Sequence, residues 1–285
     1  MATPKIDRKP STRGQEWSKI GRSAELNLEF FQAFYTTHAY PRHVHDYYVI
    51  SLIERGIQSF TCHGTKHITP PGGLILLNPD DVHTGEPADE RGFEYRALYP
   101  TVAHMRAALA QFTGRQQDIP FFSTAPIDRP MLSGSVRALH RSLFEEASPL
   151  ERESRFIWVL AQLIKDHADT RPLERAIGHE PRVIRQARDY IDAHFARGVT
   201  LTEVASYVGL SPYYFLRVFR AEVGMPPHAY LESVRIRQTQ QLLAQGMPVA
   251  EIAHEAGFSS QSHFTHRFKR LIGVTPGQYT HQLKR

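Results

Sequence analysis

Two groups of mostly polar side chains near the C-terminus have the types and spacing needed to read DNA. Each group shares an expected helix with two phenylalanines four residues apart and lies on the opposite face. An α-helix fits the major groove, where Arg and Gln form paired hydrogen bonds with guanine and adenine. The predicted DNA contacts are Tyr213, Leu216, Arg217 and Arg220 in the first group and Gln261, Ser262, Thr265, His266 and Lys269 in the second.

An internal repeat positions these two groups. The segment LTEVASYVGLS (201–211) matches VAEIAHEAGFS (249–259), and a matching pattern of Phe, Gly, Pro and Tyr follows each copy. In each copy a glycine, Gly209 or Gly257, is expected to end a short helix at a tight turn. The predicted helix N-caps are Thr202, Ser211 and either Ser259 or Ser260. This duplication favours two helix-turn-helix units over two ordinary polar helix faces.

A single long helix is predicted between the two copies, over residues 226–246. Pro227 suits its first turn and Gly246 its end. About 18 helical residues give roughly 27 Å, a spacer that can place two recognition helices about one duplex turn apart. Arg235 and Arg237 on this helix are predicted to contact phosphates.

The positive charge of the chain is concentrated in its last third. Residues 180–285 contain 13 Lys and Arg against 8 Asp and Glu, whereas the two kinds are balanced at 21 each in residues 1–179. The excess of five positive charges therefore indicates that this segment binds an anionic partner, of which nucleic acid is the first candidate. The alternative is a basic surface that is only solvated.

The segment from about 183 to 283 resembles the AraC/XylS family of bacterial regulators. The residues that carry the resemblance are A-x-x-V-G-L-S (205–211), F-x-x-x-F (215–219) and the second-copy signature that runs from Ile252 to Tyr279. The resemblance implies a seven-helix domain in which Tyr213, Leu216 and Arg217 face bases in the first unit. Gln261, Ser262, Thr265 and His266 match such positions in the second unit. His266 departs from the family's frequent arginine, and Leu216 offers no hydrogen bond.

The N-terminal half is β-rich and is followed by helices. Five runs bounded by turn residues predict strands of an antiparallel barrel or sandwich, at 28–35, 47–56, 59–64, 73–79 and 93–100. Helical periodicity follows over 102–112, 135–147 and 149–169. The apolar stripes of the last two helices either pack on the barrel or form a dimer interface, and the second is favoured. The fold class is therefore α+β with two domains, a β-barrel with trailing helices and an all-α double helix-turn-helix.

Three histidines of the barrel are candidate ligand contacts. His43 and His45 open one strand, a Pro-Gly pair follows at 71–72, and His83 comes next. This spacing resembles a cupin barrel, whose metal-binding members hold iron, manganese or zinc through such histidines and a carboxylate. That carboxylate is missing here, and the sensor domains of the AraC-like family generally bind small molecules without a metal. The predicted ligand contacts are His43, His45, Tyr47, His83, Glu86 and Tyr95, with no metal and no cofactor.

The domain plan completes these expectations. A flexible arm is predicted over 1–24, a ligand-sensing and dimerisation domain over 25–170, a linker over 171–182 and the DNA-binding domain over 183–285. Cys62, the only cysteine, is expected to be a small buried side chain. No signal peptide or membrane-spanning run is visible, which indicates a cytoplasmic protein.

Three functions are compatible with this plan. The favoured one is a non-enzymatic transcription regulator that binds promoter DNA as a homodimer, responds to a small polar effector and has RNA polymerase as a candidate partner. The alternatives are a metal-dependent cupin enzyme fused to a DNA-binding module and a structural DNA binder without a ligand. Whether the regulator activates or represses stays open.

Overall fold

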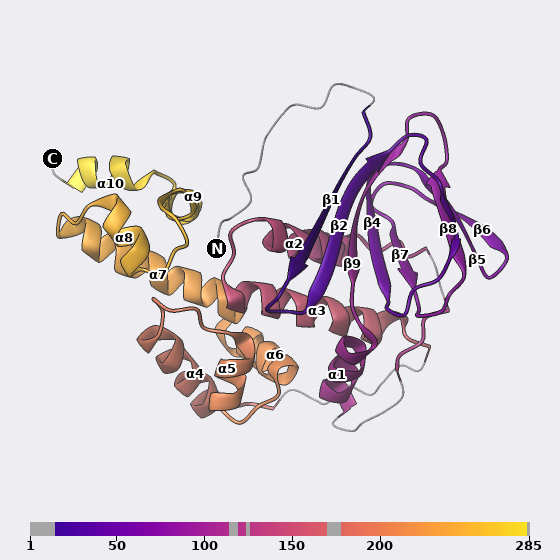
Figure 1. The fold of residues 1–285 in the computed structure, drawn as a ribbon. Helices are drawn as coiled ribbons and strands as arrows, with labels where there is room; N and C mark the ends of the chain where they lie inside the picture. The colour runs from indigo at the N-terminus through magenta and orange to yellow at the C-terminus, as the bar shows by residue number, and fades with distance from the viewer. Residues whose placement is uncertain (1–14, 114–118, 124–125, 170–177, 284–285) are drawn as a thin grey trace. The chain divides into compact units, whose positions relative to one another are not determined.

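The computed structural model describes residues 15–113, 119–123, 126–169 and 178–283 (Figure 1). The chain forms two compact units. The first contains most of the β-strands, and the second contains residues 102–123 and 134–285 together with the short segment 23–27. Most of the predicted arm and of the predicted linker lies outside the described residues.

Two sheets make up the first unit. One sheet has the strand order β1-β2-β9-β4-β7 and the other has the order β3-β8-β5-β6. The register pairs are antiparallel, for example Phe31 with Ala97 and Cys62 with His83. The strands are β1 Trp17–Ser23, β2 Leu28–Tyr35, β3 Tyr40–His43, β4 Val49–Gly56, β5 Gln58–Cys62, β6 Thr65–Thr69, β7 Leu74–Leu77, β8 His83–Pro87 and β9 Phe93–Tyr99. The predicted antiparallel β architecture is confirmed.

Four of these strands were not predicted from the sequence. β1 falls within the predicted arm, and that part of the arm prediction is wrong. β1 lies at the edge of its sheet, where most of its side chains stay in water, so it carries no apolar alternation. β3, β6 and β8 contain Pro, Lys, His or Gly and are four or five residues long. Their pairing rather than their composition makes them strands.

The second unit is helical. Helices α1 to α3 follow the strands, and seven further helices, α4 to α10, occupy the described residues after 178, which confirms the expected number. The helices are α1 Val102–Thr113, α2 Pro130–Phe144, α3 Pro149–His167, α4 Pro181–Ala193, α5 Leu201–Tyr207, α6 Pro212–Val223, α7 Pro227–Ala244, α8 Val249–Glu255, α9 Gln261–Ile272 and α10 Pro276–Leu283. None of the helices in the described ranges is both long and apolar enough to cross a membrane.

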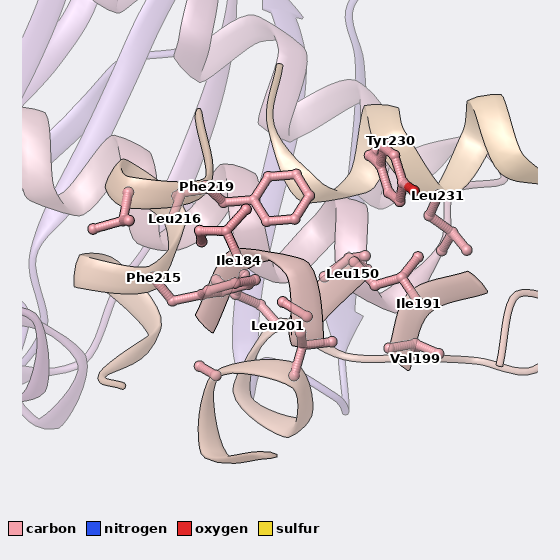
Figure 2. Close-up of a cluster of buried hydrophobic side chains, with 14 of the residues drawn as sticks. Leu150, Ile184, Ile191, Val199, Leu201, Phe215, Leu216, Phe219, Tyr230 and Leu231 are labelled. Atoms are coloured by element: carbon pink, nitrogen blue, oxygen red, sulfur yellow. The ribbon is translucent and has the colours of Figure 1, made fainter. Parts of the chain in front are cut away.

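Two hydrophobic clusters hold the C-terminal helices together. The first surrounds Phe215 and Phe219 and includes Leu150 of α3 (Figure 2). The second surrounds Phe264 and Phe268, and Phe195 packs against both clusters. The four phenylalanines are completely buried, so they are confirmed as core anchors. Leu271, which its spacing of seven residues from Phe264 also predicts to be a core anchor, is 45% exposed, and that prediction is wrong.

The apolar stripes predicted for dimerisation are covered within the chain. Leu139 and Leu163 are fully buried, and Phe156 and Leu160 are at most 5% exposed. These side chains therefore stabilise the monomer, and the preference for a dimer interface built on them is wrong. Burial of these side chains within the chain accounts for the periodicity.

Candidate DNA-binding surface and effector cavity

The two repeats fold as helix-turn-helix units, α5–α6 and α8–α9. Ser211 and Ser260 cap the second helix of each unit, because their hydroxyls accept hydrogen bonds from the amides of Tyr214 and His263. Of the two serines considered for the second unit, Ser260 is the cap. The cap of α5 is Thr200 and not the predicted Thr202.

The turns between the helices depend on glycine, as predicted. Gly209 and Gly257 have φ angles of +71° and +74°, in the left-handed region that favours glycine. A Cβ at Gly209 would meet open space, whereas one at Gly257 would lie 2.2 Å from the carbonyl oxygen of Ala196. The second turn therefore packs directly on the segment 194–200, which joins α4 to α5.

Helix α9 presents the polar face expected of a recognition helix. Gln261, Ser262, His266 and Lys269 are exposed, and Thr265 is half-buried. Phe264 and Phe268 lie on the other side and are completely buried. This face offers amide, hydroxyl, imidazole and ammonium donors along one helix, as reading base edges and phosphates requires.

Helix α6 differs, because its predicted reading face is covered. Tyr213 and Leu216 are each 2% exposed, and Tyr213 packs with Ala161 and Trp158 of α3. The amide of Tyr213 donates a hydrogen bond of 2.9 Å to Oε1 of Gln111 in α1. The expectation that both side chains face DNA is therefore not met in this conformation.

The two arginines of the same face are also engaged. Arg217 is half-buried, and its guanidinium lies 5.6 Å from the ring centre of Tyr213. Arg220 is exposed and lies 5.0 Å from the ring centre of Trp158, within cation–π range. Both arginines thus remain near the surface, but they lie along helix α3.

The long helix α7 carries one arginine inside and one outside. Arg235 is 6% exposed and donates hydrogen bonds to the carbonyl oxygens of Phe195 (2.7 Å) and Arg197 (3.1 Å). Burial lowers the pKa of Arg235 to about 10. Its predicted role as a phosphate contact is therefore wrong, because its side chain stabilises the segment 194–200. Arg237 is exposed, as a phosphate contact requires.

Acidic residues near the start of α3 bind both helix-turn-helix units. Glu153 accepts hydrogen bonds from the amides of Leu201 and Thr202 and from the Thr202 hydroxyl. Glu146, just before α3, accepts hydrogen bonds from the hydroxyls of Ser259 and Ser260. These contacts add polar links to the apolar packing between α3 and α6.

An ion-pair network continues this attachment along α9. Arg267 lies 3.1 Å from the Glu151 carboxylate and 3.6 Å from that of Glu232. Although burial opposes ionisation, Arg267 and Arg155 hold the pKa of Glu151 below its usual value. The desolvated carboxylate is therefore stabilised by its cationic partners.

The first unit contains a partly open cavity of about 110 Å³. Its wall combines imidazole, phenol, hydroxyl and amide groups with aliphatic side chains. The lining residues are Tyr40, His43, His45, Val49, Ser51, Gln58, Phe60, Ile75, Leu77, His83, Thr84, Gly85, Tyr95, Ala97 and Tyr99. The strands β4, β5, β8 and β9 contribute most of them.

Three histidines meet at this cavity, as the sequence predicted. The ring centres of His43 and His83 are 4.2 Å apart, and His45 lies 4.8 Å from His43 and 5.2 Å from His83. Burial and the two neighbouring imidazoles lower the pKa of His45 to about 4. Burial also lowers the pKa of His83. His45 and His83 are therefore neutral at neutral pH and keep a nitrogen lone pair for a ligand.

Further polar groups line the cavity. Ser51 and Gln58 are buried, and Ser51 Oγ and Gln58 Oε1 have no hydrogen-bond partner in the described part of the chain. The hydroxyls of Tyr40 and Tyr95 lie 2.8 Å apart, and burial raises the pKa of both phenols, so they stay protonated. Buried groups without partners are costly, so these atoms suit hydrogen bonds to a bound molecule.

The remaining predicted ligand contacts divide. Tyr95 lines the cavity, whereas Tyr47 stacks on the His45 ring, 4.6 Å between centres, and is not a lining residue. The prediction that Glu86 contacts a ligand in the cavity is wrong, because its carboxylate lies 3.2 Å from Nζ of Lys66 and its side chain is about half exposed. Sequence reasoning missed Ser51 and Gln58. The alternation Val49-x-Ser51 and Gln58-x-Phe60 could have identified them as inward-facing.

Cys62 behaves as expected. It is 5% exposed, and burial raises the pKa of its thiol. A protonated, buried thiol is a poor nucleophile and packs as a small apolar side chain.

A β-unit with a polar cavity and a duplicated helix-turn-helix together define a ligand-binding, DNA-binding regulator. Residues 25–160 match the model of the AraC-like ligand binding domain, and residues 204–282 match that of a helix-turn-helix domain. The chain belongs to the AraC family of transcriptional regulators.

Relatives of known sequence agree with this assignment. The Bacillus subtilis protein "Uncharacterized HTH-type transcriptional regulator YbfI" is 35% identical over 238 residues, 84% of this chain and 86% of the relative. The HTH-type transcriptional activator RhaS of Klebsiella pneumoniae is 25% identical over 248 residues, again 84% and 86%. Among solved structures, the C-terminal domain of the Geobacillus stearothermophilus response regulator AraT is 34% identical. It covers 36% of this chain and 87% of its own, with a TM-score of 0.35.

Proposed function

We propose that the protein is a sequence-specific DNA-binding regulator whose activity is controlled by a small polar molecule bound in the β-unit cavity. The observation that carries this proposal is the exposed polar face of α9, in a unit that duplicates α5–α6. Opposite this face the helix is fixed by completely buried phenylalanines. A recognition helix needs this combination of a rigid support and free donors.

The cavity supports control by a ligand. Its neutral imidazoles, protonated phenols and unpaired Ser51 and Gln58 atoms offer donors and acceptors within a partly apolar wall. A molecule of a few heavy atoms that carries both hydrogen-bond donors and acceptors fits this lining better than an apolar one. The family consists of transcription regulators, so the cavity binds an effector and not a substrate.

The packing of α6 on α3 defines a closed conformation of the DNA-binding helices. Tyr213 cannot reach base edges while it packs with Trp158 and Ala161, and Leu216 is buried in the cluster around Phe215 and Phe219. The Glu146 carboxylate accepts a hydrogen bond from the Ser260 hydroxyl at the N-terminus of α9. A helix N-terminus favours anions such as phosphate, so Glu146 lies where a DNA phosphate could bind. DNA binding through both units therefore requires α3 to release them. An effector promotes DNA binding if it binds the released form more tightly than the closed one.

The experiment that tests DNA reading uses the full chain and a pool of random-sequence duplexes. Duplexes selected from the pool are then measured by fluorescence anisotropy against Gln261→Ala. Loss of a bidentate base contact should weaken binding of the selected sequence by about 1–3 kcal/mol, or roughly 5- to 150-fold.

Gln241→Ala provides a matched control, because Gln241 is an exposed glutamine on α7. This control should bind like the wild type, and binding of both should weaken with salt. Failure of the pool to yield any preferred sequence would contradict the proposal. An equal effect of the two substitutions would also contradict it. Homodimerisation and contact with RNA polymerase stay predictions.

A further inference from the structure

A second cavity is lined by residues of the helical unit alone. It is partly open and has a volume of about 210 Å³. Helices α2, α3 and α6 and the start of α7 form its wall. Arg155 and Arg220 line it, and none of the described residues that line it is acidic. A cavity wall with this charge favours an anion.

We propose that this cavity binds a small phosphate monoester and that the bound molecule holds α3 on the DNA-binding helices. The binding site stands on the contacts of its own residues. The effect on DNA binding rests on the function proposed above.

Both arginines keep donors for an anion. Nε and Nη2 of Arg155 donate hydrogen bonds to Oε1 of Glu151, at 3.1 and 3.0 Å, and its Nη1 makes none to the described residues. Glu151 also pairs with Arg267 at 3.1 Å, so two guanidiniums share its charge. Arg220 is exposed, lies over the Trp158 ring and forms no ion pair within the described ranges. An oxyanion placed between the two arginines would therefore receive charge-assisted hydrogen bonds.

Two polar atoms at the cavity are buried without a partner. Ser154 is 1% exposed, and its Oγ makes no hydrogen bond to the described residues. The same holds for Nδ1 of His228. Burial lowers the pKa of His228 to about 4, so its ring is neutral at neutral pH and can carry its one N–H on Nδ1. Because unpaired buried polar atoms are costly, a bound group with several acceptor oxygens would satisfy both.

Helix α7 begins at the same cavity and has no side-chain cap. Its N-cap residue is Pro226, and Pro227 follows at the first helical position. The amide of His228, in the first turn, has no carbonyl partner within the helix. The helix dipole adds partial positive charge at this end, which suits phosphate. The start of the helix thus coincides with two arginines and the buried Ser154 hydroxyl.

The cavity suits a phosphate monoester better than other anions. A phosphate group has three terminal oxygens to accept hydrogen bonds from the arginines, the Ser154 hydroxyl and the His228 ring, whereas a carboxylate has two oxygens. Trp158, Leu216 and Pro226 form an apolar part of the wall. The volume is about twice the 110 Å³ of the β-unit cavity, so it leaves room for an organic group beside the phosphate. A monoester with a small apolar or aromatic group therefore fits better than inorganic phosphate.

The site is complete only in the closed conformation. Ser154 and Arg155 belong to α3, Arg220 to α6 and His228 to α7, so releasing α6 from α3 divides the site. A ligand that binds only the closed form shifts the equilibrium towards it. Arg220 is also a predicted DNA contact, and the monoester engages the guanidinium that a DNA phosphate would use. The bound monoester should therefore weaken DNA binding.

The first experiment measures binding without DNA. Trp17 and Trp158 are the two tryptophans of the chain, so a full-length Trp17→Phe chain reports on Trp158 alone. Phenyl phosphate, inorganic phosphate and phenylacetate are each titrated at constant ionic strength by calorimetry and by tryptophan fluorescence. We expect one phenyl phosphate per chain, bound more tightly than the other two anions, with a change in the Trp158 emission.

The other results of this titration would contradict the proposal. Absence of binding at millimolar phenyl phosphate would overturn the site. Binding that leaves the emission of Trp158 unchanged would overturn its location. Equal affinity for phenyl phosphate and for either of the other two anions would overturn the ligand class.

Substitutions test the residues of the site. Ser154→Ala removes a hydroxyl without a partner in the described ranges, so the chain should stay folded while its affinity for phenyl phosphate falls roughly 10- to 100-fold. Arg155→Gln should weaken binding further, because it also removes a charge. The matched controls are Ser206→Ala on α5 and Arg185→Gln on α4, both at exposed positions, and they should bind like the wild type. Normal affinity in Ser154→Ala, or an equal loss in the controls, would overturn the site.

The second experiment tests the effect on DNA binding. Anisotropy with the selected duplex is repeated at constant ionic strength with phenyl phosphate at about ten times its dissociation constant. DNA binding should weaken by up to about tenfold, and the Ser154→Ala chain should respond less. Unchanged DNA affinity would overturn the regulatory effect and leave the binding site in place. Because the first experiment involves no DNA, its failure is distinguishable from failure of sequence-specific DNA binding.

Discussion

Releasing α6 from α3 should increase DNA affinity. The substitution Ala161→Glu places a carboxylate where Ala161, 1% exposed, packs with Tyr213, 2% exposed. Burying an unpaired carboxylate costs several kcal/mol. The contact it disrupts is worth about 1.5–3 kcal/mol, the contribution of burying one large apolar side chain such as Tyr213. The free-energy difference that favours the closed conformation over the released one should therefore become small.

The gain in affinity follows from the population of the released form. If DNA binds only that form, the apparent dissociation constant is the intrinsic one divided by the released fraction. Each 1.4 kcal/mol removed from the closed form then tightens binding by about tenfold, up to full release. We expect Ala161→Glu to bind its selected duplex about 10- to 100-fold more tightly than the wild type.

Fluorescence anisotropy measures this change, and hydrogen exchange of α6 shows whether the helix is released. Ala193→Glu is the matched control, because Ala193 is an exposed alanine at the end of α4. It adds the same charge and should bind slightly more weakly than the wild type. A folded Ala161→Glu chain with unprotected α6 and unchanged DNA affinity would refute the closed conformation as a restraint on DNA binding.

Three further predictions concern stability. Gly209→Ala should lower the free energy of unfolding by about 1–2 kcal/mol, because alanine is strained at a positive φ. Gly257→Ala should lower it by more than ~3 kcal/mol, because the new Cβ would also collide with the Ala196 carbonyl oxygen. Urea unfolding compares the two variants, and equal losses would contradict the close approach of Gly257 to Ala196. Arg235→Met should cost about 2 kcal/mol in the same assay, because two hydrogen bonds from a charged donor to backbone carbonyls are lost. A neutral result would contradict the structural role of Arg235. Burial lowers the pKa of His228 and His263 from 6.5 to about 4, so the unfolded chain takes up these protons first as the pH falls. The free energy of unfolding should therefore be highest above about pH 6.5 and fall by roughly 3 kcal/mol for each histidine as the pH drops towards 4. Unfolding curves that do not change between about pH 7 and pH 5 would exclude this pH dependence.

The sequence predicted the architecture well where pattern and packing agree. The repeat at 201–211 and 249–259 and its glycines led directly to both helix-turn-helix units. β2, whose predicted bounds match the structure, has the apolar run LEFFQAFY. The convergence of His43, His45 and His83 was expected from the resemblance of their spacing to a cupin barrel, although β3 and β8, which carry His43 and His83, were not predicted.

Other features depend on tertiary contacts that no local pattern records. Tyr213 and Leu216 look like a reading face on helix α6, and only the position of α3 shows that they are covered. Arg235 resembles an exposed basic residue until the carbonyls of the segment 194–200 are placed beside it. Glu86 differs from the cavity residues because its side chain binds Lys66.

The segment 194–200 holds the two helix-turn-helix units in one fixed arrangement. Phe195 packs into both hydrophobic clusters, Arg235 binds its carbonyls, and Gly257 lies against Ala196. Because the distance between the two recognition helices is fixed, they tolerate little change in the distance between the two groups of base pairs that they read. Operators recognised by both helices should therefore keep one constant gap, and inserting even a single base pair into that gap should forfeit one of the two contacts.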